Sequence, residues 1–205
     1  MRGSSHALVG VAAASGVAIA AGHGLTVPLL FVGGFAGMLP DIDHPHSGLG
    51  RFVPWPSVEV QGKGTFVRTG RKWFGGHTVW HRGETHSIGA ACLTMAAFGA
   101  LGLMLAPHLA SVGSLVAGWA WAGSHPLWLA LFMAAAAGAG YVSHLFADLI
   151  NPSKQMWAWP LSRSMKRPRG LPSVRSGSLM GWLVETGIVA LLMAGVWAEI
   201  GSNLL

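Results

Sequence analysis

The sequence predicts an all-α protein, a polytopic membrane helical bundle with about five transmembrane helices. Three observations lead to this fold class. Of the 205 residues, 52% are hydrophobic and only 10% are charged, whereas a soluble domain carries about 25% charged residues. The 30 glycines are typical of helices that pack closely in lipid. Several of the ten tryptophans flank apolar runs, which suits side chains that anchor helices at a membrane surface.

Five apolar segments are the predicted helices of a single domain that covers 1–205. They are 7–22, 25–40, 88–106, 127–150 and 179–200. A full span needs about 20 residues, which the last three segments meet or approach. The first two have about 16 residues each, so they fit a thin bilayer or a shallow hairpin. The stretch 109–122, between Pro107 and Pro126, is predicted as an interfacial helix or loop.

The first apolar segment also resembles a secretory signal peptide. Met1-Arg2 gives a short basic start, and Ala18-Ile19-Ala20 fits a small-residue cleavage site. We favour a retained helix, because the second apolar segment follows within three residues.

The basic residues predict the orientation in the membrane. The loops 41–87 and 151–178 carry six Lys or Arg residues each, while 23–24 and 107–126 carry none. With five spans, both basic loops and the N-terminus fall on one side. The positive-inside rule makes that side the cytoplasmic face of a bacterial inner membrane. The net charge of +6 then reflects topology and attraction to anionic lipid, so membrane lipid is the predicted partner and nucleic acid ranks well behind.

Residues of the metal-ligand type gather at the cytoplasmic ends of the predicted helices. The set comprises His6, Asp41, Asp43, His81, His86, His144 and Asp148. The chain has only seven acidic residues, and an Asp beside lipid is costly unless something compensates its charge. His and Asp together are ligands of divalent metals such as zinc. The sequence therefore predicts a metal site at this face.

The spacing of the aspartates supports this hypothesis to different degrees. His144 and Asp148 are four residues apart, which puts both side chains on one helix face within reach of one ion. The alternative is a hydrogen bond from Asp148 to a neighbouring helix. In an extended segment after Pro40, Asp41 and Asp43 would point the same way, whereas a helix-terminating turn would leave both acids solvated.

Two further residues are candidates for catalytic roles. Arg82 lies between two of the histidines and can hold an anionic group such as phosphate, or contact a lipid headgroup. Glu185 lies near the cytoplasmic end of the segment 179–200. It can act as a ligand, as a base, or as a partner that orients a ligating histidine, and the alternative is an ion pair with Arg175.

Together these residues resemble the YdjM-like family of membrane-bound metal-dependent hydrolases. The motifs are Leu-Pro-Asp-Ile-Asp-His-Pro at 39–45 and His-Arg-Gly-x-Thr-His-Ser at 81–87, preceded by His6 and followed by the pair 144/148. The resemblance covers nearly the whole chain. It implies a helical bundle distantly similar to zinc-dependent phospholipase C and zinc-dependent single-strand nucleases, with the seven His and Asp residues as metal ligands. The Gly-rich, basic segment 58–77 departs from the pattern and is predicted as a flexible or lid-like insertion.

The predicted function is that of an enzyme, a membrane-bound metal-dependent hydrolase that cleaves a phosphoester in an amphiphilic substrate at the cytoplasmic membrane surface. It would use two or three divalent ions, Zn²⁺ or alternatively Mn²⁺, to activate a water. Arg82 would hold the phosphate and Glu185 would orient the water. The competing hypotheses are a membrane metal-ion transporter or sensor and a scaffold that uses metal only to join helices.

Overall fold

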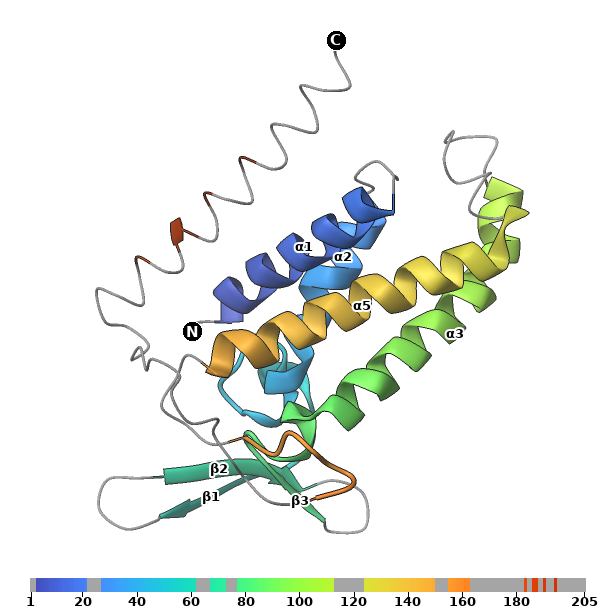
Figure 1. Cartoon of the computed structure of the whole chain (residues 1–205). Coiled ribbons are helices and arrows are strands. Elements are labelled where there is room, and N and C mark those ends of the chain that lie inside the picture. The colour runs from blue at the N-terminus through green and yellow to red at the C-terminus, as the bar shows by residue number, and fades with distance from the viewer. Residues whose placement is uncertain are drawn as a thin grey trace.

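The structure is a computed structural model of the chain. It describes residues 3–21, 27–61, 67–72, 77–112, 124–149 and 155–162, together with Leu183, Thr186, Gly187, Ala190 and Ala194. The helices α1 (Gly3–Ala20), α2 (Val27–Ala36), α3 (Ile88–Val112) and α5 (Pro126–Leu149) form the body. A small sheet lies beyond the end of this bundle at which α3 begins and α5 ends (Figure 1). The connections that carry the predicted ligands are therefore concentrated at that end.

The helices follow the predicted apolar segments, with two differences at prolines. The second helix is shorter than expected, because the chain turns into the 3₁₀ helix η1 (Leu39–Asp43) after Ala36. Pro40 stands in the first turn of η1, where its missing N–H breaks no hydrogen bond. The third helix is longer than expected, since α3 continues through Pro107 to Val112. Residues 113–123 lie outside the described part of the chain.

Among the described residues, two helices are long and apolar enough to cross a membrane: Ile88–Leu109 within α3, and Pro126–Leu149, which is α5. The 10 residues of α2 extend over about 15 Å, half of a hydrocarbon core. The expectation of about five transmembrane helices is thus not confirmed by the described residues. The predicted span 179–200 falls almost entirely outside them.

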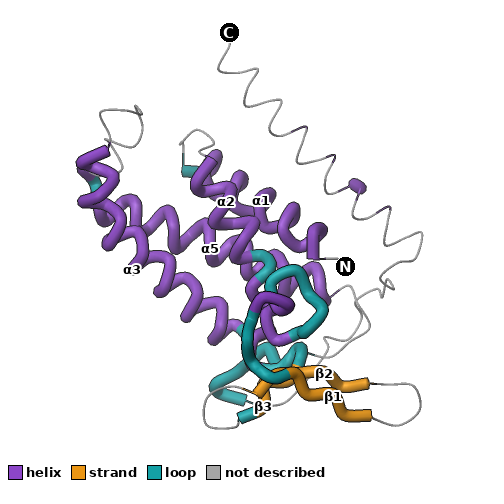
Figure 2. Tube along the Cα trace, turned by 180° about the vertical axis from the view of Figure 1, so that it is seen from behind, coloured by secondary structure: helices purple, strands orange, loops and turns teal. Residues whose placement is uncertain are grey.

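The all-α expectation is wrong in one respect, because the segment between η1 and α3 contains a sheet. Strands β1 (Ser57–Gln61), β2 (Val67–Lys72) and β3 (Thr78–Trp80) pair antiparallel in the order β1-β2-β3 (Figure 2). β1 and β2 occupy most of the described part of the insertion predicted at 58–77, and β3 follows it. Its β-branched residues favour strands, but its glycines and basic residues obscured that pattern.

Arg71 ties this sheet to the turn that follows η1. Its guanidinium is buried and donates hydrogen bonds to the carbonyl oxygens of Gly50, Val53 and Trp55. Charge-assisted bonds of this kind are stronger than neutral ones. The sheet therefore holds the chain downstream of the aspartates in place.

Helices α1, α2 and α5 approach so closely that their backbones touch. A Cβ added at Gly33 would lie 2.7 Å from the carbonyl oxygen of Gly10, and one at Gly140 would overlap the carbonyl oxygen of Gly33. Small residues allow this approach in membrane bundles. The apolar core beside these contacts is formed by Ala14, Val32, Ala36, Met133, Ala136 and Ala137. This packing fixes the relative positions of the ends of α1 and α5.

Candidate metal centre

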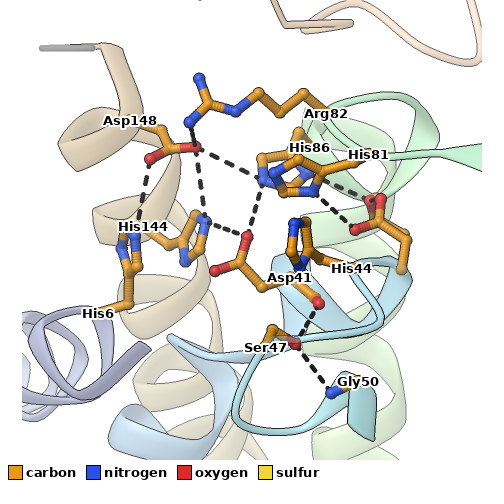
Figure 3. Close-up of polar contacts among 12 residues, drawn as sticks. His6, Asp41, His44, Ser47, Gly50, His81, Arg82, His86, His144 and Asp148 are labelled. Atoms are coloured by element: carbon orange, nitrogen blue, oxygen red, sulfur yellow. Dashed lines mark hydrogen bonds and ion pairs between the residues drawn. The ribbon is translucent and has the colours of Figure 1, made fainter. Parts of the chain in front are cut away.

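The first part of the candidate centre is built on helices (Figure 3). His6 on α1 and the pair His144 and Asp148 on α5 offer ligand atoms that all lie within 4.8 Å of one another. We call these three residues the helix-borne group. The two imidazole rings stack with centroids 3.7 Å apart, and Nε2 of His6 lies 3.6 Å from Oδ1 of Asp148. All three side chains are buried.

The second part is built on turns. Asp41 in η1, His81 after β3 and His86 in the 3₁₀ helix η4 (Glu84–His86) likewise offer ligand atoms within 4.8 Å of one another. We call these three the turn-borne group. Nε2 of His86 lies 3.4 Å from Oδ1 of Asp41, and the rings of His81 and His86 meet edge to face at 5.0 Å.

Two carboxylates join the groups. Asp41 Oδ1 also lies 3.6 Å from Nε2 of His144, and Asp148 Oδ2 lies 3.6 Å from Nε2 of His86. Each carboxylate thus faces histidines of both groups, so the two groups form one continuous cluster.

Asp43 lies behind the cluster rather than in it. It is completely buried and accepts hydrogen bonds from Nδ1 of His81, at 3.0 Å, and from the hydroxyl of Thr85. A carboxylate in this position orients a metal-binding histidine. Of the two alternatives for 41–43, the extended segment is wrong, because the chain forms a 3₁₀ turn that directs Asp41 and Asp43 to different partners, and this turn does not leave Asp43 solvated.

The hydrogen bonds assign the protons of three histidines. Carbonyl and carboxylate oxygens only accept, so Nδ1 of His144, 2.7 Å from the carbonyl of Gly37, and Nδ1 of His81 both donate. The Thr85 hydroxyl donates to Asp43 and accepts from Nδ1 of His86, 3.2 Å away. In the neutral rings, each Nε2 is therefore left with a lone pair. This is the tautomer that a metal-binding histidine adopts.

These lone pairs fit a divalent cation. Nε2 of His86 and Nε2 of His144 are buried without a hydrogen-bond partner among the described residues, yet both face the Asp41 carboxylate at 3.4 and 3.6 Å. Those separations exceed a good hydrogen bond but match the spacing of about 3.3 Å between ligands of a tetrahedral zinc. Lone pairs and carboxylates that face one another repel unless a cation lies between them.

The electrostatics of the turn residues point the same way. Burial disfavours ionisation of Asp41, but the polar contact with His86 and the nearby charges of His144, His86 and His6 outweigh it and hold the pKa of Asp41 below its usual value. Burial also disfavours the charged form of His86, but Asp41, Asp43 and Asp148 raise its pKa above the usual value. The site therefore favours positive charge, which a metal ion supplies when it displaces protons.

Arg82 adds a fixed positive charge at the edge of the cluster. One terminal nitrogen lies 3.3 Å from Oδ2 of Asp148, and the other is buried without a hydrogen-bond partner in the described part of the chain. Its backbone φ is 63°, a left-handed conformation that is uncommon for residues other than glycine. Backbone strain of this kind concentrates at functional sites.

The other predicted site residue is Glu185, and three further polar residues belong to the two motifs. Glu185 is outside the described residues. Glu84 contacts His77 at 3.3 Å, away from the two groups. Ser87 caps α3, since its hydroxyl accepts from the N–H of Ala90 at 3.1 Å. The ring of His44 lies 4.7 Å from that of His81, at the side of the cluster.

The sequence did not predict that Gln155 is buried. Gln155 is completely buried, and among the described residues neither atom of its amide has a hydrogen-bond partner. Its backbone lies beside Arg82, because the N–H of Met156 donates to the Arg82 carbonyl at 3.2 Å. No spacing or periodicity marks a single glutamine in a basic loop.

Comparison with known proteins agrees with the resemblance seen in the motifs. The family described as YdjM inner membrane protein matches residues 1–203. No curated protein and no solved structure matches the chain. The family match covers nearly the entire sequence, and α3 and α5 supply helices that can cross a membrane. The chain therefore belongs to the YdjM inner membrane protein family.

Proposed function

We propose that this membrane protein is a metal-dependent hydrolase of phosphoesters. The observation that carries the proposal is the Arg82 guanidinium, 3.3 Å from Asp148 at the edge of two His/Asp groups. Phosphoryl transfer needs positive charge around the phosphoryl oxygens and an activated water. A guanidinium beside ligands for divalent ions meets the first need directly.

The donor set supports two or three divalent ions, with Zn²⁺ favoured by the mixture of imidazole and carboxylate and Mn²⁺ as the alternative. When bound, the ions would supply a water activated for attack and would neutralise charge on the phosphoryl oxygens. The protein's own contributions are distinct. Arg82 binds a phosphoryl oxygen, Asp43 orients the His81 ring, and Glu185, outside the described residues, keeps its predicted role of orienting the attacking water.

The position of the cluster supports an amphiphilic substrate. His144 and Asp148 belong to the last turns of the apolar helix Pro126–Leu149, and α3 begins with Ile88, two residues after His86. The cluster thus lies where the apolar helices meet polar turns, at the depth of lipid headgroups. A substrate with a phosphoester headgroup and an apolar tail would reach it from the bilayer.

The charge pattern supports a cytoplasmic position for the centre. Arg51, Lys72 and Arg82 lie in the turns and sheet at the metal-centre end, while the connection between α3 and α5 carries no Lys or Arg. The positive-inside rule assigns the basic end to the cytoplasm. In a Cys92→Ala background, Glu59→Cys should react with an impermeant maleimide only after the inner membrane is opened. Labelling in intact spheroplasts would reverse the assignment.

A metal-ion transporter or sensor is the alternative, because intramembrane His and Asp also line ion paths. The sequences of α1, α2 and α3 contain no Asp, Glu, Lys or Arg, and α5 contains only Asp148, at its end. An ion path through these helices would have no charged residue at the middle of the membrane. This distribution favours hydrolysis at one face over transport.

Hydrolysis is tested with detergent-purified protein reconstituted with Zn²⁺ or Mn²⁺. The substrates are phospholipids, isoprenoid phosphates and nucleotides, with release of phosphate or headgroup as the measurement. We expect turnover that a chelator abolishes and that Arg82→Ala reduces at least 100-fold, with Arg51→Ala as the exposed control. Fully metal-loaded protein that cleaves none of these substrates, but moves metal into proteoliposomes, would replace the proposal with transport.

A further inference from the structure

Two segments that lie side by side, one with Arg82 and one with Gln155, carry buried polar atoms that make no hydrogen bond to the described residues. Oε1 and Nε2 of Gln155 and one terminal nitrogen of Arg82 are inaccessible to solvent and have no hydrogen-bond partner within the described part of the chain. Gln155 as a whole is 0% exposed. Buried amides in native proteins are almost always hydrogen-bonded, and an unpaired one costs stability. These atoms are therefore suited to partners other than the described side chains.

The backbone brings Gln155 and Arg82 together. The N–H of Met156 donates to the carbonyl of Arg82, and two residues further the carbonyl of Trp157 accepts from the N–H of Ile88 at 3.0 Å. The segment 155–162, orange in Figure 1, thus runs along the turn that carries Arg82 and along the start of α3. The backbone of Gln155 is therefore held next to the backbone of the turn that carries Arg82.

The chemistry of these atoms selects the kind of group that they can bind. A guanidinium repels cations and pairs with phosphate or carboxylate. The amide nitrogen of Gln155 also donates, and so it suits the oxygens of the same anion. The amide oxygen only accepts, so it needs a donor, which a bare phosphodiester lacks. The complete ligand therefore carries anionic oxygens and a hydroxyl close to them.

We propose that Arg82 and Gln155 form a binding subsite for a phosphoryl group with a neighbouring hydroxyl, as in a glycerol phosphate or sugar phosphate headgroup. The inference rests on the proposed function and names its substrate class. Arg82 and Nε2 of Gln155 donate to phosphoryl oxygens, and Oε1 accepts from the hydroxyl. A choline headgroup, which has no hydroxyl, leaves Oε1 unpaired and binds more weakly.

The test is the binding of two phosphomonoesters to the full-length, Zn²⁺-supplied protein in detergent, measured by calorimetry at pH 8, where both esters are dianions. Glycerol 3-phosphate should bind wild type at least tenfold more tightly than n-propyl phosphate, which has the same charge but no hydroxyl. Gln155→Leu, which removes donor and acceptor at similar volume, should weaken glycerol 3-phosphate at least tenfold and reduce the preference below twofold. The matched control is Gln61→Leu at the exposed end of β1, which should behave as wild type.

The outcomes separate this subsite from the proposed function. Wild type without a preference for glycerol 3-phosphate overturns the subsite and needs no variant. A folded Gln155→Leu variant that binds glycerol 3-phosphate as tightly as wild type also overturns the subsite, since the amide then binds only structural water. If Gln155→Leu does not fold, Gln155→Met is used in its place. Gln155-dependent binding without hydrolysis of any phosphoester retains the subsite and removes the hydrolase. Hydrolysis that does not depend on Gln155 retains the hydrolase and removes the subsite.

A second arm identifies the source of the headgroup. Phosphatidylglycerol and phosphatidylpropanol, which have the same charge and differ in the headgroup hydroxyls, replace the soluble esters in mixed micelles, with the same variants. Binding of phosphatidylglycerol that is tighter than that of glycerol 3-phosphate assigns a lipid source, and the reverse assigns a soluble one. Equal binding of the two lipids by wild type contradicts the proposed recognition of the hydroxyl in a lipid.

Discussion

The two halves of the candidate metal centre are built from different kinds of structure. The helix-borne group stands on α1 and α5, whose positions are fixed by backbone contacts at Gly10, Gly33 and Gly140. The turn-borne group stands on 3₁₀ helices and turns, which are held by side-chain hydrogen bonds such as those from Thr85 to Asp43 and from Arg71 to the turn after η1. We conclude that packing preorganises the first half, while the second half depends more on polar contacts and would depend more on a bound ion.

The largest effect is expected where the two halves meet. Asp148 faces His6 and His86, one histidine from each group, and contacts Arg82. Asp148→Ala should lower the Zn²⁺ affinity more than 100-fold, because removing even an outer partner of a ligand costs 10–100-fold. Competition with a chromophoric chelator measures this change. Glu59→Ala, an exposed carboxylate on β1, is the control, and an equal loss in both variants would contradict a shared site.

The Zn²⁺ affinity of the turn-borne group should fall strongly when the buried carboxylate of Asp43 is replaced. Asp43→Asn removes the negative charge of the carboxylate that accepts hydrogen bonds from His81 and Thr85. We expect a loss of Zn²⁺ affinity of about 10–100-fold, measured by the same competition. Thr85→Ser keeps the hydroxyl and should stay within about twofold. An Asp43→Asn variant with wild-type affinity would show that Asp43 has no role in positioning the ligands.

The helices that carry the helix-borne group should lose stability when their close packing is disturbed. Gly140→Ala places a methyl group against the Gly33 carbonyl, so α5 must move away from α2. Overpacking of this kind costs about 1–3 kcal/mol, measured by unfolding in detergent. Gly16→Ala on α1 has nothing within 4 Å and should be neutral or slightly stabilising. Equal destabilisation by both substitutions would argue against close packing of α2 and α5.

Removal of metal should increase local opening in the turn-borne group more than in the helix-borne group. Removing metal with EDTA should speed amide hydrogen exchange about fivefold in 39–56 and 81–87, because a ligand that binds only the ordered form suppresses local opening. Exchange in α1 and α5 should change less than twofold. Hydrogen-exchange mass spectrometry resolves these peptides. A uniform response across helices and turns would remove the distinction between the halves.

The parts of the cluster that were predictable are those that depend on local periodicity. The spacing of His144 and Asp148 has one meaning on a helix, and α5 places both residues as that period requires, with Nε2 of His144 3.9 Å from Oδ2 of Asp148. The cap of α3 is equally local, since the hydroxyl of Ser87 accepts from the N–H of Ala90, three residues further on. In both cases, residues close in the chain decide the geometry, so the sequence is sufficient.

Other features depend on contacts between distant segments and could not be read from the chain. The different roles of Asp41 and Asp43 arise from the 3₁₀ turn and from histidines about 40 residues further on. The sheet at 57–80 depends on pairing between strands that are individually short and polar. Gln155 is buried because its segment packs along Arg82 and α3. Nothing in its own neighbourhood in the sequence indicates this burial.

The central claim is that the cluster holds metal ions, and metal content tests it most directly. Mass spectrometry on detergent-purified protein should be compared between wild type and the His144→Ala/Asp148→Ala double variant, each reconstituted with Zn²⁺. We predict about two equivalents in wild type, one for each group, and loss of both in the double variant, because Asp148 faces both groups. Wild type that holds no metal after reconstitution would contradict the account and leave the His and Asp residues as a proton or hydrogen-bond network.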